Sequence, residues 1–245
     1  MDGNRSRLTK LGWLLVGIAA VAVTIRLVGL GARVAHQDEA RVASWILHYM
    51  AVDAWEYRAI IHGPFIPHVN GFIFGLLEPS DFSMRLPVAL VGGLLPLSAW
   101  FLRDRLDRVE VLFLGAILAL NPILLYYSRF MRNDVLLAAF AFLAFVLVVR
   151  AVDTGKRRYL LLAGLSFGLA MTTKENALLY PVTWAGALVL LLDQRLFLAR
   201  YRERGWYGTL KGTVWRAVVG VWRAKYAVVG GVLVLATVVV AFYAP

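Results

Sequence analysis

The stretch LGWLLVGIAAVAVTIRLVGLGA at residues 11–32 decides the fold. Arg26 is its only charged residue, and a helix of about 20 mostly apolar residues crosses the hydrocarbon core of a bilayer. A signal peptide also has a basic start and an apolar run, but Arg33 disrupts the small-residue pattern that cleavage at Ala35 would need. The sequence therefore predicts an uncleaved first membrane helix.

Six further apolar runs follow this one, separated by charged segments. The predicted spans are Leu11–Ala32, Leu86–Leu102, Val109–Tyr127, Val135–Val149, Tyr159–Thr173, Ala177–Leu192 and Tyr226–Ala244. With 60% hydrophobic and 17% charged residues, the chain is more apolar than a soluble domain. It has no cysteine, which excludes a disulfide framework, a thiol nucleophile and a cysteine-ligated zinc site. The predicted fold is an all-α, polytopic transmembrane helical bundle of about seven spans.

Basic residues are concentrated in alternate loops. The basic set comprises the N-terminal segment and residues 103–108, 153–158 and 193–225. The sparser set comprises residues 33–85, 128–134 and 174–176. Because cytoplasmic loops carry the excess of Lys and Arg, we predict a multi-pass protein of the cell membrane with a cytoplasmic N-terminus and with loop 33–85 outside. These loops explain the net charge of +11, so no nucleic-acid partner is predicted.

The basic segment 193–225 also carries three tryptophans. Trp215 and Trp222 are seven residues apart, so a helix presents both on one face. Such a helix, rich in Trp, Arg and Lys, is typical of the lipid interface. We expect a surface-anchoring helix here, with a binding role as the alternative.

The first outer loop, residues 33–85, contains two neighbouring carboxylates, Asp38 and Glu39, directly after the first span. Apolar residues recur at helical spacing from Asp38 to Ile61, which predicts a helix lying on the membrane, and Pro64 ends it. At the start of this helix the two carboxylates are either an N-terminal cap or a catalytic base with an orienting partner. The loop is thus expected to carry juxtamembrane helices.

All four histidines of the chain also lie in this loop. They are His36, His48, His62 and His68. Their spacing matches no tight metal motif, so they are either ordinary loop residues or, with Asp or Glu, ligands of a divalent cation.

Each remaining outer loop offers a cation at the membrane surface. The residues are Arg85 before the second span, Arg129, Arg132 and Asp134 between the third and fourth, and Lys174 and Glu175 between the fifth and sixth. Arginine holds phosphate oxygens bidentately and lysine holds them as a point charge. These residues are therefore candidates for phosphate binding, and the alternative is that they anchor the helices by snorkelling.

The order of these motifs resembles that of membrane-embedded glycosyltransferases of the GT-C type. An Asp-Glu pair at 38–39 follows the first span, then His-Gly-Pro at 62–64 and Arg-Leu-Pro at 85–87. The chain is similar to the family 39-like group of protein O-mannosyltransferases and lipid A aminoarabinose transferases, and most similar to the archaeal flippase-activity-associated proteins of N-glycosylation. The resemblance covers about residues 11–190 and depends on the order of the motifs.

Two departures from that group are visible. The group often has His-Pro-Pro-Leu, whereas this chain has His-Gly-Pro-Phe at 62–65. Members also have more spans, so residues 1–245 are expected to be one membrane glycosyltransferase-like domain, the N-terminal portion of a longer protein.

The resemblance implies a hexosyltransferase-like enzyme. It would move a sugar from a polyprenyl-phosphate carrier, such as dolichyl phosphate, to a glycan, lipid or protein acceptor at the outer membrane face. Asp38 would be the base and Glu39 its orienting partner. The substrate-binding residues would be His62, Arg85, Arg129, Arg132, Asp134, Lys174 and Glu175. No fixed metal site is predicted, and a weakly bound Mg or Mn cation is the expected cofactor.

The alternative function is non-enzymatic, that of a lipid-carrier flippase accessory or transporter subunit. Such a protein would also need cations that bind phosphate at the membrane surface. Transport favours charged residues that face a cavity inside the spans, and the predicted spans are nearly free of charge. This distribution favours chemistry at the surface.

Overall fold

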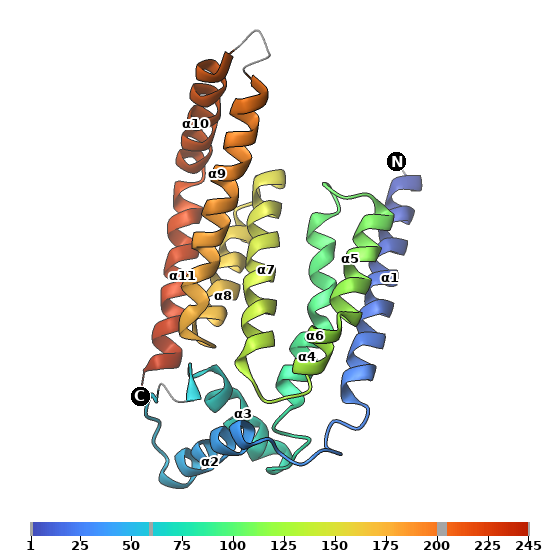
Figure 1. The fold of residues 1–245 in the computed structure, drawn as a ribbon, viewed down its shortest axis with the longest axis vertical. Helices are drawn as coiled ribbons and strands as arrows, with labels where there is room; N and C mark the ends of the chain where they lie inside the picture. The colour runs from blue at the N-terminus through green and yellow to red at the C-terminus, as the bar shows by residue number, and fades with distance from the viewer. Residues whose placement is uncertain (1, 59–60, 200–204, 245) are drawn as a thin grey trace.

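The computed structural model describes residues 2–58, 61–199 and 205–244, and this part of the chain forms helices without any strand (Figure 1). The elements are α1 (Asp2–Leu27), α2 (Gln37–Val52), α3 (Phe65–Leu77), α4 (Leu86–Leu94), η2 (Leu95–Leu102), α5 (Arg108–Leu120), α6 (Pro122–Tyr127), α7 (Asn133–Thr154), α8 (Arg158–Met171), η3 (Glu175–Leu178), α9 (Leu179–Ala199), α10 (Gly205–Arg223) and α11 (Lys225–Tyr243). Most run lengthwise, while α2 and α3 lie across one end of the bundle, which we call the α2–α3 end (Figure 1).

Four helices are long and apolar enough to cross a membrane. They are Leu8–Leu27, Asn133–Thr154, Glu175–Ala199 and Lys225–Tyr243. Each coincides with a predicted span, so the prediction of a multi-pass, all-helical membrane protein is confirmed. The remaining three predicted spans correspond to helices that are shorter or interrupted.

The predicted span at 109–127 is not one helix. Pro122 has no N–H to donate to the preceding turn, and the side-chain oxygen of Asn121 accepts the backbone N–H of Ile123 at 3.0 Å and of Leu124 at 3.1 Å. Helix α5 therefore ends at Leu120, and α6 begins anew at Pro122. The prediction of a continuous helix was wrong here because the apolar residues on both sides conceal the break.

A buried arginine of α1, Arg26, hydrogen-bonds to the backbone at this break. Arg26 Nη1 donates to the carbonyl of Ala119 at 2.9 Å, and Arg26 Nε donates to Ser128 Oγ at 2.8 Å. The Ala119 carbonyl needs such a donor because the N–H of Ile123 has turned to Asn121. Arg26 thereby ties α1 to the end of α5 and to the turn that leads into α7.

Helices α8 and α11 make close backbone contact. A Cβ on Gly164 would lie 2.1 Å from the carbonyl oxygen of Gly231, and a Cβ on Gly231 would lie 2.8 Å from that of Leu160. Small residues at such crossings let transmembrane helices gain van der Waals contact that lipid does not replace. Through this contact α11 reaches the α2–α3 end, where Phe242 stacks on Phe65 at 5.9 Å.

The two sets of loops lie at opposite ends of the bundle (Figure 1). Loops 103–108 and 153–158 lie at the end that holds the N-terminus, called here the N-terminal end. Arg105 of the first of these loops binds Asp153, at the end of α7, at 2.8 Å. The turns at 128–134 and 174–176 lie at the α2–α3 end. The loops rich in basic residues and the loops sparse in them thus lie at opposite ends of the fold.

Two expected helices differ from the sequence prediction. The helix expected from Asp38 to Ile61 ends earlier, because Asp53 adopts a left-handed backbone, with φ of 51°, directly after α2. The helix expected within 193–225 is α10. It continues the line of α11 beyond the end of α7 and does not lie across the bundle (Figure 1).

Candidate active site

The start of α2 decides where the two neighbouring carboxylates point. His36 is the N-cap: its Nδ1 accepts the backbone N–H of Asp38 at 3.2 Å, and Glu39 Oε2 accepts the backbone N–H of His36 at 2.9 Å. This reciprocal arrangement is a capping box. The cap interpretation is therefore confirmed for Glu39, which closes the box, and was wrong for Asp38, because His36 takes the N-cap position. The Asp38 carboxylate is left for other contacts.

Glu39 and Arg85 form a sealed ion pair, and both side chains are 0% exposed. Arg85 donates from Nε and Nη2 to the two oxygens of Glu39, both at 2.9 Å. The backbone N–H of Met131 also donates to Glu39, at 2.8 Å. Arg85 Nη1 donates to the carbonyls of Leu30 and Arg33. The pair thus holds together the end of α1 and the starts of α2, α4 and α7.

The Glu39 carboxylate is held in its charged form. Burial raises its pKa, but hydrogen bonds from Arg85 and from the backbone N–H groups of His36 and Met131 outweigh burial, so the pKa lies below its ordinary value. Neither Glu39 nor Arg85 reaches a surface that a substrate can touch. We therefore leave both out of the proposed reaction and assign them to positioning.

Four of the predicted residues meet in an open row of alternating charge. Asp38 Oδ2 lies 3.3 Å from Arg132 Nη1, and Arg132 Nε lies 3.3 Å from Asp134 Oδ2. Lys174 Nζ donates to Asp134 Oδ1 at 2.8 Å. We call Asp38, Arg132, Asp134 and Lys174 the charge array. Unlike the sealed pair, it is open to solvent, with the Asp38 side chain 47% exposed.

Two further predicted residues meet beside the array. His62 Nδ1 lies 3.4 Å from Glu175 Oε2. The hydroxyl of Tyr57 donates to Glu175 Oε1 at 2.8 Å. That bond to a carboxylate, together with burial, raises the pKa of Tyr57 to about 12. Tyr57 was missed because an isolated tyrosine in a loop gives no sequence signal.

The turn that presents His62 needs a glycine after it. The backbone N–H of Gly63 donates to the carbonyl of Thr173 at 3.1 Å, and that of Phe65 donates to Thr172 at 2.9 Å. A Cβ on Gly63 would lie 2.2 Å from the Thr172 oxygen. His62 itself has a φ of 63°, in the left-handed region that non-glycine residues seldom adopt. The His-Gly-Pro run is therefore a tight turn docked on the end of α8.

A polar cavity of about 180 Å³ lies between α2 and the start of α7. Its lining residues are Asp38, Arg41, Val42, Ile61, His62, Ile66, Met131, Arg132, Asn133 and Asp134. Sequence reasoning missed Arg41, although its spacing of three from Asp38 places both on one face of α2. In the described ranges no carboxylate pairs with Arg41, so its charge is available to a ligand.

A model of one protein family, described as dolichyl-phosphate-mannose-protein mannosyltransferase, matches residues 61–219, more than half of the chain. The chain belongs to this family. It is therefore a membrane glycosyltransferase. The matched residues include most of the charge array, whereas Asp38 precedes them. No curated protein and no solved structure matches the chain.

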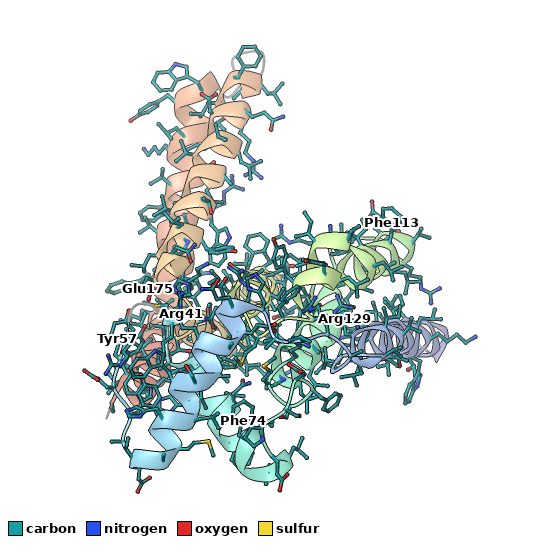
Figure 2. All side chains as sticks on the ribbon, turned by 60° about the horizontal axis from the view of Figure 1, so that its bottom comes forward. Arg41, Tyr57, Phe74, Phe113, Arg129 and Glu175 are labelled. Carbon is teal, nitrogen blue, oxygen red and sulfur yellow. The ribbon has the colours of Figure 1, made fainter. Side chains whose placement is uncertain are left out.

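Arg129, another predicted residue of this mannosyltransferase-family protein, also lies apart from the cavity. Arg129 Nη2 donates to the carbonyls of Val28 and Gly29 at 2.9 and 3.1 Å and so closes the end of α1. Figure 2 shows Arg129 on the side of α1, away from Arg41 and Glu175. Its contacts explain the residue by the fold alone.

The site offers no ready cage for a metal ion. Within residues 2–58, 61–199 and 205–244, no three His, Asp or Glu side chains are grouped to hold one. The two carboxylates of the cavity, Asp38 and Asp134, are both engaged by Arg132. The cation stays a prediction, and no step below uses it.

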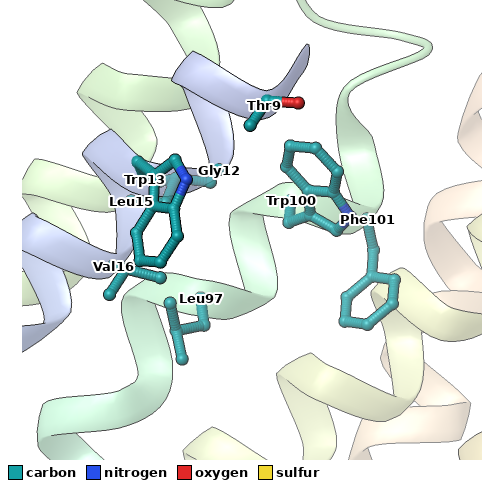
Figure 3. Close-up of a pocket in the computed structure, with 8 residues that line it drawn as sticks. All are labelled: Thr9, Gly12, Trp13, Leu15, Val16, Leu97, Trp100 and Phe101. Carbon is teal, nitrogen blue, oxygen red and sulfur yellow. The ribbon is translucent and has the colours of Figure 1, made fainter. Parts of the chain in front are cut away.

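Two apolar pockets lie along the bundle. One, of about 430 Å³, lies between α4–η2 and α7–α8, and its serines Ser98 and Ser166 already donate to backbone carbonyls. The other, of about 410 Å³, lies between α1 and η2 and is lined mainly by apolar side chains such as Trp13 and Trp100 (Figure 3). Neither contains a titratable side chain, so neither is a candidate for the chemistry.

Proposed function

We propose that this membrane glycosyltransferase moves a sugar from a polyprenyl-phosphate carrier to a hydroxyl group of a glycan, lipid or protein acceptor at the outer membrane face. The polar cavity between α2 and α7 is the proposed active site. The observation that carries the proposal is an open carboxylate, Asp38, that shares this cavity with Arg41 and Arg132 at one end of a membrane bundle.

The proposed topology has seven crossings. The short or interrupted helices α4–η2, α5–α6 and α8 complete the set, since neighbouring helices cover their ends and a thinner bilayer accommodates the rest. Loops rich in Arg and Lys at the N-terminal end favour a cytoplasmic location for that end. The α2–α3 end then faces outward, with α2 and α3 on the membrane surface.

Asp38 is the proposed general base. Arg132 contacts its Oδ2, while no described residue hydrogen-bonds to its Oδ1. The acceptor oxygen attacks the anomeric carbon, the bond from that carbon to the phosphate oxygen breaks, and the hydroxyl proton passes to Asp38 Oδ1. This single displacement inverts the anomeric carbon, whereas a covalent intermediate would retain it.

The departing polyprenyl phosphate needs positive charge more than it needs a proton. Arg41 is the first candidate to supply it, because its guanidinium has no acidic partner in the described residues and lines the cavity. Arg132 and Lys174 can add to this field, although each already faces a carboxylate. Preorganised cations stabilise the developing charge without reorganisation during the reaction.

The carrier also has a long apolar tail. The cavity of about 430 Å³ is a candidate for its first isoprene units. Val91, Phe140 and Leu169 line this cavity and also pack on a neighbouring hydrophobic cluster. Two members of that cluster, Ile66 and Met131, line the polar cavity. The apolar and polar parts of the carrier would thus meet adjacent surfaces.

The alternative, a flippase accessory or transporter subunit, needs charged groups along a path through the spans. The two buried arginines of the spans do not form one. Arg26 is bound to Ala119 and Ser128, and Arg150 is bound to Asp104 at the other end of the bundle. These contacts favour transfer.

The deciding experiment uses the full-length protein in vesicles. A labelled sugar is supplied on polyprenyl phosphate or, as the control donor, on a nucleotide, together with a hydroxyl acceptor. We expect labelled acceptor with the lipid donor only, and one free polyprenyl phosphate for each product. Carrier that crosses the vesicle membrane without any labelled acceptor would replace this proposal with the flippase function.

A further inference from the structure

Helix α10 has two unlike faces. Thr209, Gly212 and Thr213 are half-buried on one face of α10, and α10 pairs with α9. The other face is a stripe of large side chains at helical spacing, namely Tyr207, Val214, Trp215, Val218, Val221 and Trp222, each about half exposed or more. The helix thus has one face of small residues and one face of large, exposed apolar side chains.

The hairpin of α9 and α10 projects away from the other helices, and two views 60° apart agree on this (Figures 1 and 2). If α10 stayed in line with the span α11, its 19 residues would extend about 28 Å beyond the end of α11. A contiguous apolar patch of this kind in water marks a surface that binds something. The stripe therefore needs an occupant.

The charge of this region identifies the occupant. Lys211 lies within the stripe, and Lys225 Nζ sits 4.1 Å from the ring centroid of Trp222. Residues 205–245 contain no Asp or Glu, and among the residues that the structure describes no carboxylate forms an ion pair with these lysines or with Arg216 and Arg223. Tryptophan beside lysine and arginine is typical of helices that lie on anionic bilayers.

We propose that the stripe of α10 lies on the anionic lipid surface at the N-terminal end of the bundle. To do so, α10 turns out of the line of α11 at Ala224, the single residue between them, whose φ and ψ of −97° and 5° lie outside the helical range. The aromatic rings then enter the headgroup boundary, and the lysines meet lipid phosphates. This surface is separate from the charge array, which lies at the opposite end.

The chain has no cysteine, so single cysteines report on each face. Val218→Cys labels the stripe. Gly220→Cys labels a position about 200° round the helix, on the side of Thr209 but clear of α9, because a Cβ there meets nothing within 4 Å. The full chain, labelled with an environment-sensitive fluorophore, is placed in phosphatidylcholine vesicles with or without phosphatidylglycerol. Quenchers confined to lipid and iodide in water then report the position of each probe.

We expect the probe at position 218 to be quenched from the lipid, more strongly with phosphatidylglycerol, and the probe at 220 to be quenched by iodide. Lys211→Gln should lower the ratio of lipid-contacting to water-exposed probe at 218 by about fivefold, the equivalent of about 1 kcal/mol for one lysine. Equal iodide quenching at both positions would overturn the proposal. Shielding at 218 that rises with protein concentration and shows no lipid quenching would overturn it too, in favour of a protein partner.

Discussion

Asp38 and Glu39 are neighbours in the chain, yet they belong to opposite kinds of electrostatic environment. Glu39 is sealed with Arg85, and every contact it makes is to this protein. Asp38 is half exposed and contacts Arg132 through Oδ2, while no residue that the structure describes hydrogen-bonds to its Oδ1. One step along a helix turns the side chain by about 100°, and here that step separates a buried structural carboxylate from the exposed one that we propose as the base.

The two ion pairs contribute differently to the stability of the fold. A buried pair that loses one partner leaves an uncompensated charge, which costs about 3–5 kcal/mol. An exposed pair such as Asp38 with Arg132 is screened by water and contributes about 0–1 kcal/mol. The sealed pair therefore stabilises the fold, and the charge array can exchange its contacts for those of a substrate at little cost.

The largest expected effect is on stability, in the sealed pair. Glu39→Gln or Arg85→Met should each lower the free energy of unfolding by about 3–5 kcal/mol, because each leaves its partner buried and unpaired. Asp53→Asn is the matched control. Asp53 is an exposed acid at the far end of α2, and asparagine tolerates its left-handed backbone. Denaturant unfolding in detergent measures the free energy of unfolding of all three variants. If Glu39→Gln and Arg85→Met were as stable as Asp53→Asn, the pair would not stabilise the fold.

The same pair predicts a dependence on pH. The folded-state pKa of Glu39 is lowered, so its stabilisation is fully present above the ordinary value of about 4.3 and is lost as the pH falls through the lowered pKa. The difference in unfolding free energy between the wild type and Glu39→Gln should stay constant from about pH 8 to 5 and shrink below. A difference that grows on acidification would contradict this sign.

The next effect concerns the turn that presents His62 to the cavity. Gly63→Ala places a methyl group against the Thr172 carbonyl and should destabilise the protein by about 1–3 kcal/mol through overpacking. Sugar transfer should fall as well, since His62 moves with the turn. Gly75→Ala is the control, because its Cβ meets nothing within 4 Å. If the two variants behave alike in unfolding and transfer, the docked turn is not needed.

A smaller effect separates the free cation from the structural one. A hydrogen bond to a charged group contributes about 1.5–3 kcal/mol, so Arg41→Gln should raise the KM for the carrier about 10–100-fold. Arg129→Gln should leave that KM within about twofold, because the Arg129 guanidinium donates to the carbonyls at the end of α1 and does not line the cavity. Steady-state kinetics of transfer measures the KM of both variants. A larger rise in KM for Arg129→Gln than for Arg41→Gln would show that Arg129, and not Arg41, binds the phosphate.

The smallest effect is expected from removal of metal. The weakly bound cation predicted from the sequence would only add to side-chain cations that can neutralise a phosphate alone, so chelator should lower transfer by less than about twofold. A large loss that magnesium or manganese restores would establish the divalent cation predicted from the sequence.

Much of the bundle followed from the sequence because apolar length and basic loops report directly on the membrane. The break at Asn121–Pro122 was also visible, since Asn-Pro initiates turns, but the long apolar run outweighed it. The separation of Asp38 from Glu39 was not visible. It depends on His36 taking the cap, which fixes the register of α2, and on Arg85 arriving from α4, a contact between residues far apart in the chain.

We propose that Asp38 performs the chemistry and that Glu39 stabilises the fold. The most direct test of this proposal is turnover per folded molecule for Asp38→Asn and Glu39→Gln in one preparation, with the folded fraction measured by unfolding. We predict that Asp38→Asn unfolds like the wild type but transfers sugar about 10²–10⁴-fold more slowly, as loss of a general base requires. Glu39→Gln should lose stability while its folded molecules stay far more active than Asp38→Asn. Near-normal turnover in Asp38→Asn would show that Asp38 is not the general base.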